Sequence, residues 1–194
     1  NYQLKHRITG IISYNFEYAK HFKTSIALFY NGNSGQPFTY LVNGDLNSDG
    51  RFGNDLLYVP ADASQIRFID RLNGAGTAVV STAAEQAAAF EAFIKADKYL
   101  SSRRGKYTER NGRSTPWEHV IDARIAQDFF VNMGGNKHDV QLTFDIFNLT
   151  NLIDKSWGRQ YSVGNQAYNL LTAVNRTGTF AGKGYNFTPQ VPWG

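Results

Sequence analysis

The chain has 194 residues and a net charge of +4, with 20 basic side chains that are spread too widely for the concentrated basic surface of a nucleic-acid-binding protein. It has no cysteine, which excludes disulfide bonds and thiolate metal sites. It also has no run of about 18 apolar residues, which excludes a transmembrane helix, whereas a mean hydropathy of -0.41 is compatible with membrane strands that alternate polar and apolar side chains.

The N-terminal region alternates with period two, which predicts two β-strands over residues 4–16 and 22–30. One face of these strands carries the apolar side chains of Ile8, Ile12, Ile26 and Leu28. The opposite face carries polar side chains that include Arg7 and Lys23. The short connection from Glu17 to His21 is typical of a β-hairpin.

Residues 31–116 predict a long loop that contains one helix near residues 82–100. Thr82 and Glu85 have the spacing of a capping box, in which each side chain accepts a backbone N–H of the other residue. The helix carries an apolar stripe of Phe90, Phe93, Ile94 and Leu100. Such a stripe usually packs against neighbouring structure, and a partner-binding face is the alternative.

Within this loop, the segment NGDLNSDGRFGND (43–55) matches the first half of a calcium-binding loop, D-x-[DN]-x-[DN]-G. The candidate ligands are the side chains of Asp45, Asn47, Asp49 and Asp55 and the backbone carbonyl of Arg51. The second half does not match, because Leu56 occupies the position of the closing Glu and Asp55 comes one residue early. Two interpretations follow: a Ca²⁺ ion that holds the loop rigid, or a metal-free turn rich in Asp, Asn and Gly.

The C-terminal half predicts two more strands, over residues 119–129 and 140–147, joined by the short turn 132–137. Their apolar face carries Ile121, Ile125, Leu142, Phe144 and Ile146, and their polar face carries Asp122, Arg124, Asp128 and Asp145. The chain after Leu149 is predicted to be irregular.

Strands of this length, joined alternately by short turns and long loops, are typical of an outer-membrane β-barrel. Aromatic side chains are expected to form a girdle at each end. Those at the short-turn end are Tyr14, Phe16, Tyr18, Phe22, Phe129 and Phe130, and those at the long-loop end are Tyr30, Phe38, Tyr40 and Trp117. The predicted fold is therefore all-β: an antiparallel transmembrane β-barrel segment of about four to five strands. A water-soluble β-sandwich is the alternative.

Three segments in order, residues 29–60, 93–129 and 140–158, resemble the C-terminal barrel region of TonB-dependent outer-membrane transporters. The nearest branch is the Oar-like and SusC-like group typical of Bacteroidetes. The resemblance implies that residues 1–194 are part of one outer-membrane barrel domain of about 22 strands, and that the loop 31–116 is extracellular. It further implies a plug domain and a terminal strand that lie outside this chain.

Such a protein would import a large nutrient, such as a glycan, a peptide or a chelated metal, with energy delivered by TonB. The resemblance implies as partners the rest of the barrel, the plug domain, TonB, a surface lipoprotein and outer-membrane lipid. The polar-face charges would meet the plug domain or guide the solute. No catalytic motif is present in the sequence, so we expect no enzyme. The alternative is a soluble, calcium-stabilised β adhesin or carbohydrate-binding module.

Overall fold

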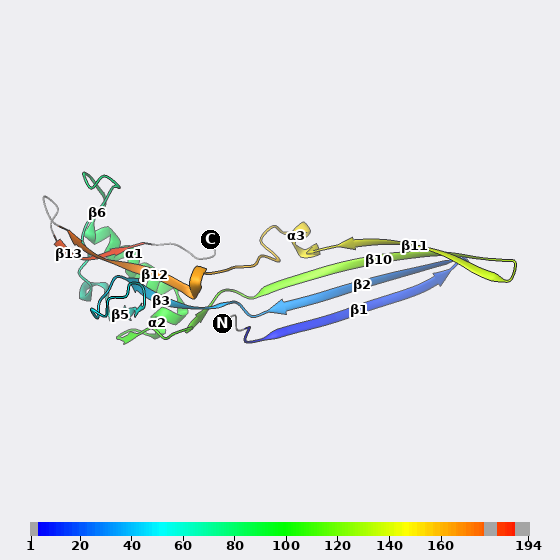
Figure 1. Ribbon diagram of the computed structural model, residues 1–194, viewed down its shortest axis with the longest axis horizontal. Helices are drawn as coiled ribbons and strands as arrows, with labels where there is room; N and C mark the ends of the chain where they lie inside the picture. Colours follow the sequence, from blue (N-terminus) through cyan, green and yellow to red (C-terminus); the bar gives the residue numbers. More distant parts are fainter. Residues whose placement is uncertain (1–3, 177–181, 189–194) are drawn as a thin grey trace. The chain divides into compact units, whose positions relative to one another are not determined.

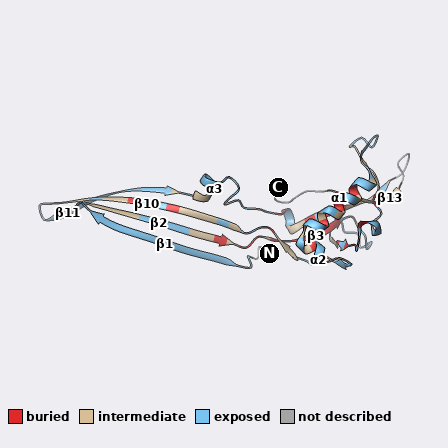
Figure 2. Cartoon of the chain, turned by 180° about the vertical axis from the view of Figure 1, so that it is seen from behind, coloured by how far each residue is buried: buried red, intermediate tan, exposed pale blue. Residues whose placement is uncertain are grey.

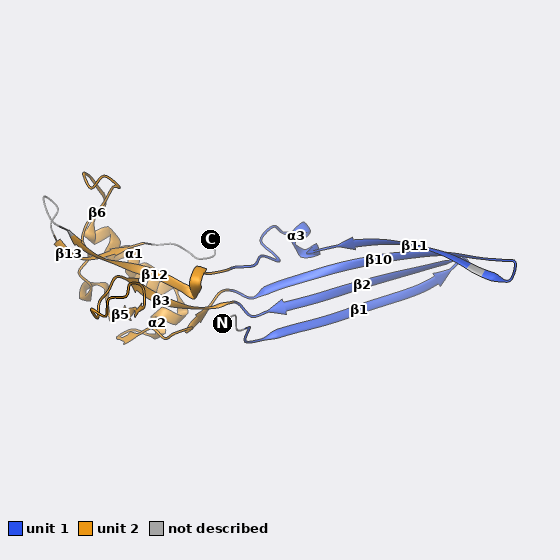
Figure 3. Cartoon of the chain, in the orientation of Figure 1, with its two compact units in different colours: residues 1–35, 116–161 blue, residues 36–115, 162–194 orange. Residues whose placement is uncertain are grey.

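The computed structural model describes residues 4–176 and 182–188 and divides the chain into two compact units (Figures 1 and 3). Unit 1 comprises residues 1–35 and 116–161, and unit 2 comprises residues 36–115 and 162–194. The fold is mostly β, with 48% strand and 17% helix, and its sheets are largely antiparallel. Among the described residues, no helix has the length and apolar character needed to cross a membrane.

Unit 1 is built on a four-stranded antiparallel sheet with the order β1-β2-β10-β11. Its strands are β1 (Arg7–Tyr18), β2 (Phe22–Asn33), β10 (Glu118–Met133) and β11 (Asn136–Ile146), and a short helix α3 (Leu149–Ile153) follows them. The turn between β10 and β11 consists of Gly134 and Gly135, whose φ angles of 60° and 82° suit a two-residue hairpin of type I′. The four strands expected from the sequence are thus confirmed with shifted ends: β1 begins at Arg7 and not at residue 4, and β2, β10 and β11 are longer than predicted.

The register of the sheet brings the apolar positions of all four strands onto one face, because directly paired residues share a face. Ile12 pairs with Leu28, Leu28 pairs with Ala123, and Ala123 pairs with Ile146. We call this the apolar face; it comprises Ile8, Ile12, Tyr14, Phe16, Tyr18, Phe22, Ile26, Leu28, Tyr30, Ile121, Ala123, Ile125, Phe129, Val140, Leu142, Phe144 and Ile146.

The apolar face is open along most of its length (Figure 2). Ile12 is 76% exposed and Phe144 is 63% exposed, although both are large apolar side chains. The buried residues of β10 are only Ala123 and Ala126, which are small enough to be shielded by their strand neighbours. The described residues of unit 1 therefore form no second layer over this face.

Unit 2 contains a five-stranded sheet that mixes parallel and antiparallel pairs. β3 (Pro37–Asn43) lies between β12 (Ala167–Arg176), to which it is parallel, and the short strands β4 (Asp55–Leu56) and β9 (Arg113–Ser114). β13 (Gly182–Phe187) forms the other edge beside β12. The remaining elements are β5 (Tyr58–Val59), η1 (Ala63–Gln65), β6 (Arg71–Leu72), β7 (Val79–Ser81), α1 (Ala83–Ala96), α2 (Lys98–Ser102), β8 (Lys106–Tyr107) and η2 (Gly164–Gln166).

The helices of unit 2 pack on this sheet and close a hydrophobic core (Figure 2). Phe90 and Ile94 of α1 and Leu100 of α2 are fully buried. Gln86 is the polar member of the same helix face: its amide nitrogen donates to the Ile69 carbonyl, and its oxygen accepts the Phe187 N–H of β13. The predicted packing role of the helix stripe is confirmed, and so is the capping box between Thr82 and Glu85.

Three expectations about residues 31–116 and the chain beyond Leu149 are wrong. Two helices replace the single predicted one, because Asp97 ends α1 and caps α2 by accepting the N–H groups of Tyr99 and Leu100. Phe38 and Tyr40 are buried in the core of unit 2 and are not part of a girdle. The region after Leu149 supplies α3, β12 and β13 and is not irregular throughout.

Candidate functional site

Two rows of aromatic side chains bound the apolar face. The turn-end row consists of Tyr14, Phe16, Tyr18, Phe22 and Phe129, whose successive ring centroids are 5.5–5.8 Å apart. The loop-end row consists of His6, Tyr30, Trp117 and His119, with centroids 6.0–6.4 Å apart. Between the rows the face carries aliphatic side chains such as Ile12 and Ile26.

The spacing of the two rows is set by the length of β10. His119 and Phe129 are ten positions apart on this strand. At about 3.3 Å per residue this corresponds to roughly 33 Å along the strand, and to about 25 Å across a bilayer for a strand tilted by about 40°.

The polar groups near the turn-end row bond one another on the apolar face. Gln127 Oε1 accepts hydrogen bonds from Thr24 Oγ1 at 2.6 Å and from the Tyr18 hydroxyl at 2.9 Å. Its amide nitrogen donates to the carbonyls of Lys23 and Asp128. Gln127 therefore needs no water to satisfy its side chain, which matters on a face surrounded by apolar groups.

The opposite face of the sheet carries the charged residues that the sequence placed together. Arg124 forms a two-pronged ion pair with Asp145, with contacts of 2.6 and 3.0 Å. Asp128 accepts the amide of Gln141 at 2.6 Å, and Asp122 accepts the Asn148 N–H at 2.7 Å. Ile11 and Phe29, which are paired in the register, form one apolar spot within this polar face.

In unit 2, the candidate calcium loop is an exposed turn closed by its own hydrogen bonds. Asp45 accepts the N–H groups of Asp49 and Gly50, each at 3.0 Å, and Asp49 accepts the Arg51 N–H at 2.8 Å. The bond from the Arg51 N–H, followed by the bond from the Asn54 amide, lowers the pKa of the Asp49 carboxyl.

The other predicted ligands lie in the same loop. Asn47 Oδ1 accepts the Asp49 N–H, and Asp55 Oδ2 accepts the Leu46 N–H at 2.9 Å. Among the described residues, no three His, Asp or Glu side chains come together as a metal-binding group. The arrangement is that of the hydrogen-bonded turn.

Two features of the loop nevertheless suit a hard cation. Gly50 has a φ of 80°, the left-handed conformation that the sharp turn of a calcium loop requires. Asn54 Oδ1 is buried and has no hydrogen-bond partner among the described residues, while its amide donates to Asp49. An orphaned amide oxygen next to carboxylates is a donor of the type that Ca²⁺ prefers.

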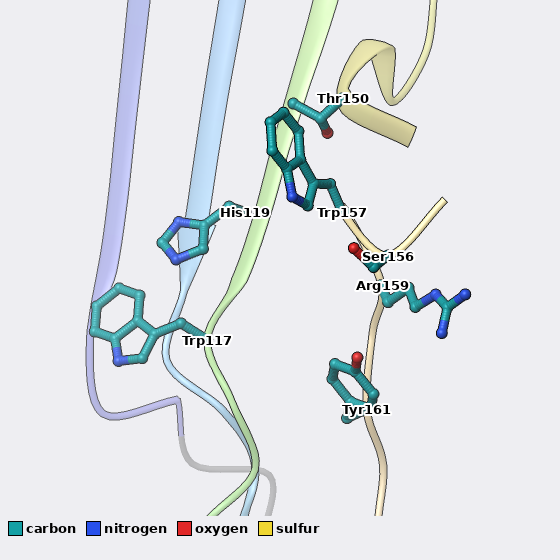
Figure 4. A pocket seen from close by; sticks show the side chains of 8 residues that line it. Trp117, His119, Thr150, Ser156, Trp157, Arg159 and Tyr161 are labelled. Atoms are coloured by element: carbon teal, nitrogen blue, oxygen red, sulfur yellow. The ribbon is translucent and has the colours of Figure 1, made fainter. Parts of the chain in front are cut away.

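A cavity of about 290 Å³ lies in unit 1 at the loop end of the sheet (Figure 4). Its residues come from the start of β10 and from the segment that follows β11: Trp117, His119, Thr150, Ser156, Trp157, Gly158, Arg159 and Tyr161. Trp117 and His119 continue the apolar face, because they alternate in phase with Ile121 along the strand. The cavity thus opens beside the loop-end aromatic row.

Hydrogen bonds hold the segment that carries Trp157 against the start of α3. Asn148 donates to the Gly158 carbonyl at 3.1 Å, and Asn151 donates to the Trp157 carbonyl at 3.1 Å. Gly158 has a φ of 63° and lies so close to the Asn148 side chain that a Cβ would collide with it. A glycine is therefore required at this position for the loop to close.

Sequence reasoning identified Trp117 as a girdle residue but missed the cavity. Trp157 lies in a region predicted to be irregular. The only local sequence feature that could have indicated the cavity is a tryptophan followed by glycine and arginine in a polar loop. No family model matches the chain, and no curated protein and no solved structure matches it either.

Proposed function

We propose that the chain is a wall segment of an outer-membrane β-barrel of the TonB-dependent transporter type, which imports a large nutrient such as a glycan, a peptide or a chelated metal. The observation that carries this proposal is the continuous apolar face of the four-stranded sheet, which is open in this chain and bounded at both ends by aromatic rows. Outer-membrane barrels have an outward apolar band about 25 Å tall between two aromatic girdles.

Hydrocarbon is the occupant of the apolar face that its chemistry favours. A soluble protein partner would not explain why aromatic rows lie at both ends of the face. A bilayer would explain them, because Trp, Tyr and His suit its two interfaces with water. The self-contained bonding of Gln127 has the same explanation. The soluble adhesin alternative needs Ile12, Leu142 and Phe144 in a dry core, and the described residues provide none around them.

In this proposal the charged face lines the barrel interior, where Arg124 and Asp145 meet water or a plug domain. The two outer edges, β1 and β11, pair with no further strand among residues 4–176 and 182–188 and would pair with the remaining strands of the barrel. Unit 2 would lie on the extracellular side and contribute to solute capture. TonB, a plug domain and a surface lipoprotein remain proposed partners, and the proposed location is the bacterial outer membrane.

Single-cysteine labelling tests this proposal directly, because the chain has no cysteine of its own. We compare Ile12→Cys with Ser13→Cys, and Leu142→Cys with Thr143→Cys, each carrying an environment-sensitive fluorophore in phospholipid bilayers. We expect a lipid-soluble quencher to act on the labels at Ile12 and Leu142, and an aqueous quencher to act on those at Ser13 and Thr143. Equal exposure to water at adjacent positions would refute the membrane assignment.

The loop 43–55 is proposed to hold one Ca²⁺ ion, with Asp45, Asn47, Asp49, the Arg51 carbonyl and Asp55 as ligands. The orphaned oxygen of Asn54 supports this proposal, and each carboxylate oxygen of Asp45 retains a second lone pair beyond its bond to a backbone N–H. The ion would neutralise the negative charge of the carboxylates and hold the loop rigid.

Removal of the ion tests the calcium proposal. An ion present at about 100 times its dissociation constant stabilises the native state by about 2.7 kcal/mol, so chelation should lower the melting temperature of unit 2 measurably. Asp45→Asn should abolish the response to chelator, whereas Asp62→Asn, at an exposed aspartate that caps η1, should retain it. An unchanged melting curve in chelator would leave the metal-free turn as the correct interpretation.

A further inference from the structure

The cavity at the loop end of unit 1 combines an aromatic interior with a cationic rim. Trp117 is 40% exposed and Trp157 is 51% exposed, although both line the same cavity. Trp117 stacks with His6 and His119, whereas among the described residues Trp157 makes no ring contact. Both indoles therefore line the cavity while partly exposed, and the His119 ring that stacks on Trp117 lines it with them (Figure 4).

No lining residue of the cavity is a carboxylate, and the nearby Asp154 carboxyl accepts the hydroxyl and N–H of Ser156, which lower its pKa together with the charge of Arg159. Arg159 donates through Nε to the Lys155 carbonyl at 2.7 Å, which fixes the plane of its guanidinium. Among the described residues no carboxylate forms an ion pair with its two terminal nitrogens, and a guanidinium held in this way suits the paired oxygens of a phosphate. Ser156 and Thr150 also line the cavity, and their hydroxyls donate to Asp154 and Asn148, respectively.

The arrangement of these groups separates the apolar and charged parts of the cavity. Figure 4 shows Trp157 beside the strand that carries His119, while the Arg159 side chain extends to the outer side of the same loop. The loop is held by the bonds of Asn148 and Asn151, so the groups are in place before a ligand arrives. A ligand that fits both parts has an apolar body and an anionic head.

We propose that this cavity binds a phosphate-bearing lipid, with its apolar part between Trp117 and Trp157 and its phosphate at Arg159. The proposal rests on the proposed function, because a bilayer around the apolar face would place the loop-end row, and hence the cavity, at the membrane interface. Trp and Arg at that depth meet lipid acyl chains and headgroups respectively. A soluble sugar or free phosphate is a weaker fit, since neither uses the indoles and the guanidinium together.

Vesicle partition with the full chain tests this inference. The probes are phosphatidylcholine vesicles and vesicles of phosphatidylcholine mixed with phosphatidylglycerol, and partition is measured by flotation. We expect tighter binding to the anionic vesicles, and we expect Arg159→Gln to reduce that preference by about fivefold, the effect of one basic residue near an anionic surface. Arg159→Lys should retain much of the preference, which separates loss of charge from loss of fold.

Arg110→Gln is the matched control, because Arg110 is an exposed arginine of unit 2 that lies outside the cavity. An equal loss in Arg110→Gln would overturn the proposal, since it would indicate general attraction by the net positive charge. Binding to neither kind of vesicle would instead refute the membrane assignment on which the proposal rests. Tight binding of inorganic phosphate in the absence of vesicles, lost in Arg159→Gln, would assign the rim to free phosphate and reject the lipid.

A second readout locates the lipid at the indoles. In a Trp193→Phe background, phospholipids brominated on their acyl chains should quench the fluorescence of Trp117 and Trp157. We expect stronger quenching by brominated phosphatidylglycerol than by brominated phosphatidylcholine, and equal quenching by the two in Arg159→Gln. Equal quenching by the two brominated lipids in the chain that retains Arg159 would contradict a site that selects the anionic lipid.

Discussion

Unit 2 buries its large apolar side chains inside its own fold, whereas unit 1 presents side chains of the same kind on an open face. Phe90 and Ile94 of unit 2 are 0% exposed, and Ile12 of unit 1 is 76% exposed. Unit 2 therefore closes its own core, whereas unit 1 leaves its apolar face uncovered by the described residues, which is the feature that the proposed membrane location would explain.

The same difference governs the polar groups. In unit 2, buried Gln86 joins α1 to β13 and to the Ile69 carbonyl. In unit 1, Gln127 is bonded just as fully, by Thr24 and Tyr18, although no layer of protein covers it. A fully bonded glutamine is expected in a core, and on an open apolar face it agrees with the proposal that this face meets lipid.

The largest effect that separates the two units is expected from removing one aromatic ring from each. Phe90→Ala should destabilise unit 2 by about 3–5 kcal/mol, because it removes a fully buried ring and leaves a cavity. Phe144→Ala removes the same side chain from the apolar face of unit 1 and should leave unit 2 unchanged. Hydrogen exchange of the α1 amides, measured in mild detergent, reports the stability of unit 2 in both variants.

Comparable protection of α1 in Phe90→Ala and in the unaltered chain would contradict a tightly packed core in unit 2. Loss of α1 protection in Phe144→Ala would show that unit 2 depends on the apolar face of unit 1.

A smaller effect is expected from a charge placed on the apolar face. Ile12→Arg should weaken the partition of the chain into phosphatidylcholine vesicles by about 2–4 kcal/mol, the cost of an arginine near the midplane of the bilayer. Ser13→Arg places the same side chain on the polar face of the same strand and should have little effect. Flotation measures both variants, and equal losses would contradict the difference between the two faces.

The smallest effect is expected at the capping box of α1. Thr82 accepts the Glu85 N–H, and Glu85 accepts the Thr82 N–H at 2.8 Å. Thr82→Ala should therefore destabilise unit 2 by about 1 kcal/mol. Denaturant unfolding followed by α1 helicity measures this change, and Ser162→Ala, at an exposed serine of unit 2 outside the helix, provides the control.

The capping box also predicts a pH dependence with a defined sign. The hydrogen bond from the Thr82 N–H, followed by that from its side chain, lowers the pKa of Glu85. A carboxyl whose pKa is lower in the folded state adds stability above its ordinary pKa, and this stability is lost as the pH falls through the lowered value. Glu85→Gln should therefore remove part of the acid sensitivity of α1; acid sensitivity equal to that of the unaltered chain would contradict the assignment.

The strands of unit 1 could be predicted from the sequence because their alternation is local. Each strand has one polar and one apolar face, so period two is visible in residues such as Ile12 and Ser13. β3 of unit 2 is buried on both faces from Pro37 to Val42, and such a strand shows no alternation. Phe38 and Tyr40 were consequently assigned to a girdle, although they belong to a core.

The two candidate sites also differ in whether a local sequence pattern reveals them. The loop from Asp45 to Asp55 was recognised because its ligand-type residues follow one another in sequence. The cavity between Trp117 and Trp157 depends on a segment that returns to the start of β10 after the whole β10-β11 hairpin. No pattern within either segment reports that contact, so only the structure brings the two tryptophans together.

The parallel pairing of β3 with β12 has a consequence for the order in which the chain folds. Thr39 is paired with Ala167, so β10 and β11 are synthesised after β3 and before its parallel partner. Such distant pairing is slow, because the intervening chain must first be brought into a closed loop. The antiparallel hairpins of unit 1 can form as soon as they are made, whereas β3 must wait with one edge open, and a chaperone that shields it during this interval would improve the yield of native protein.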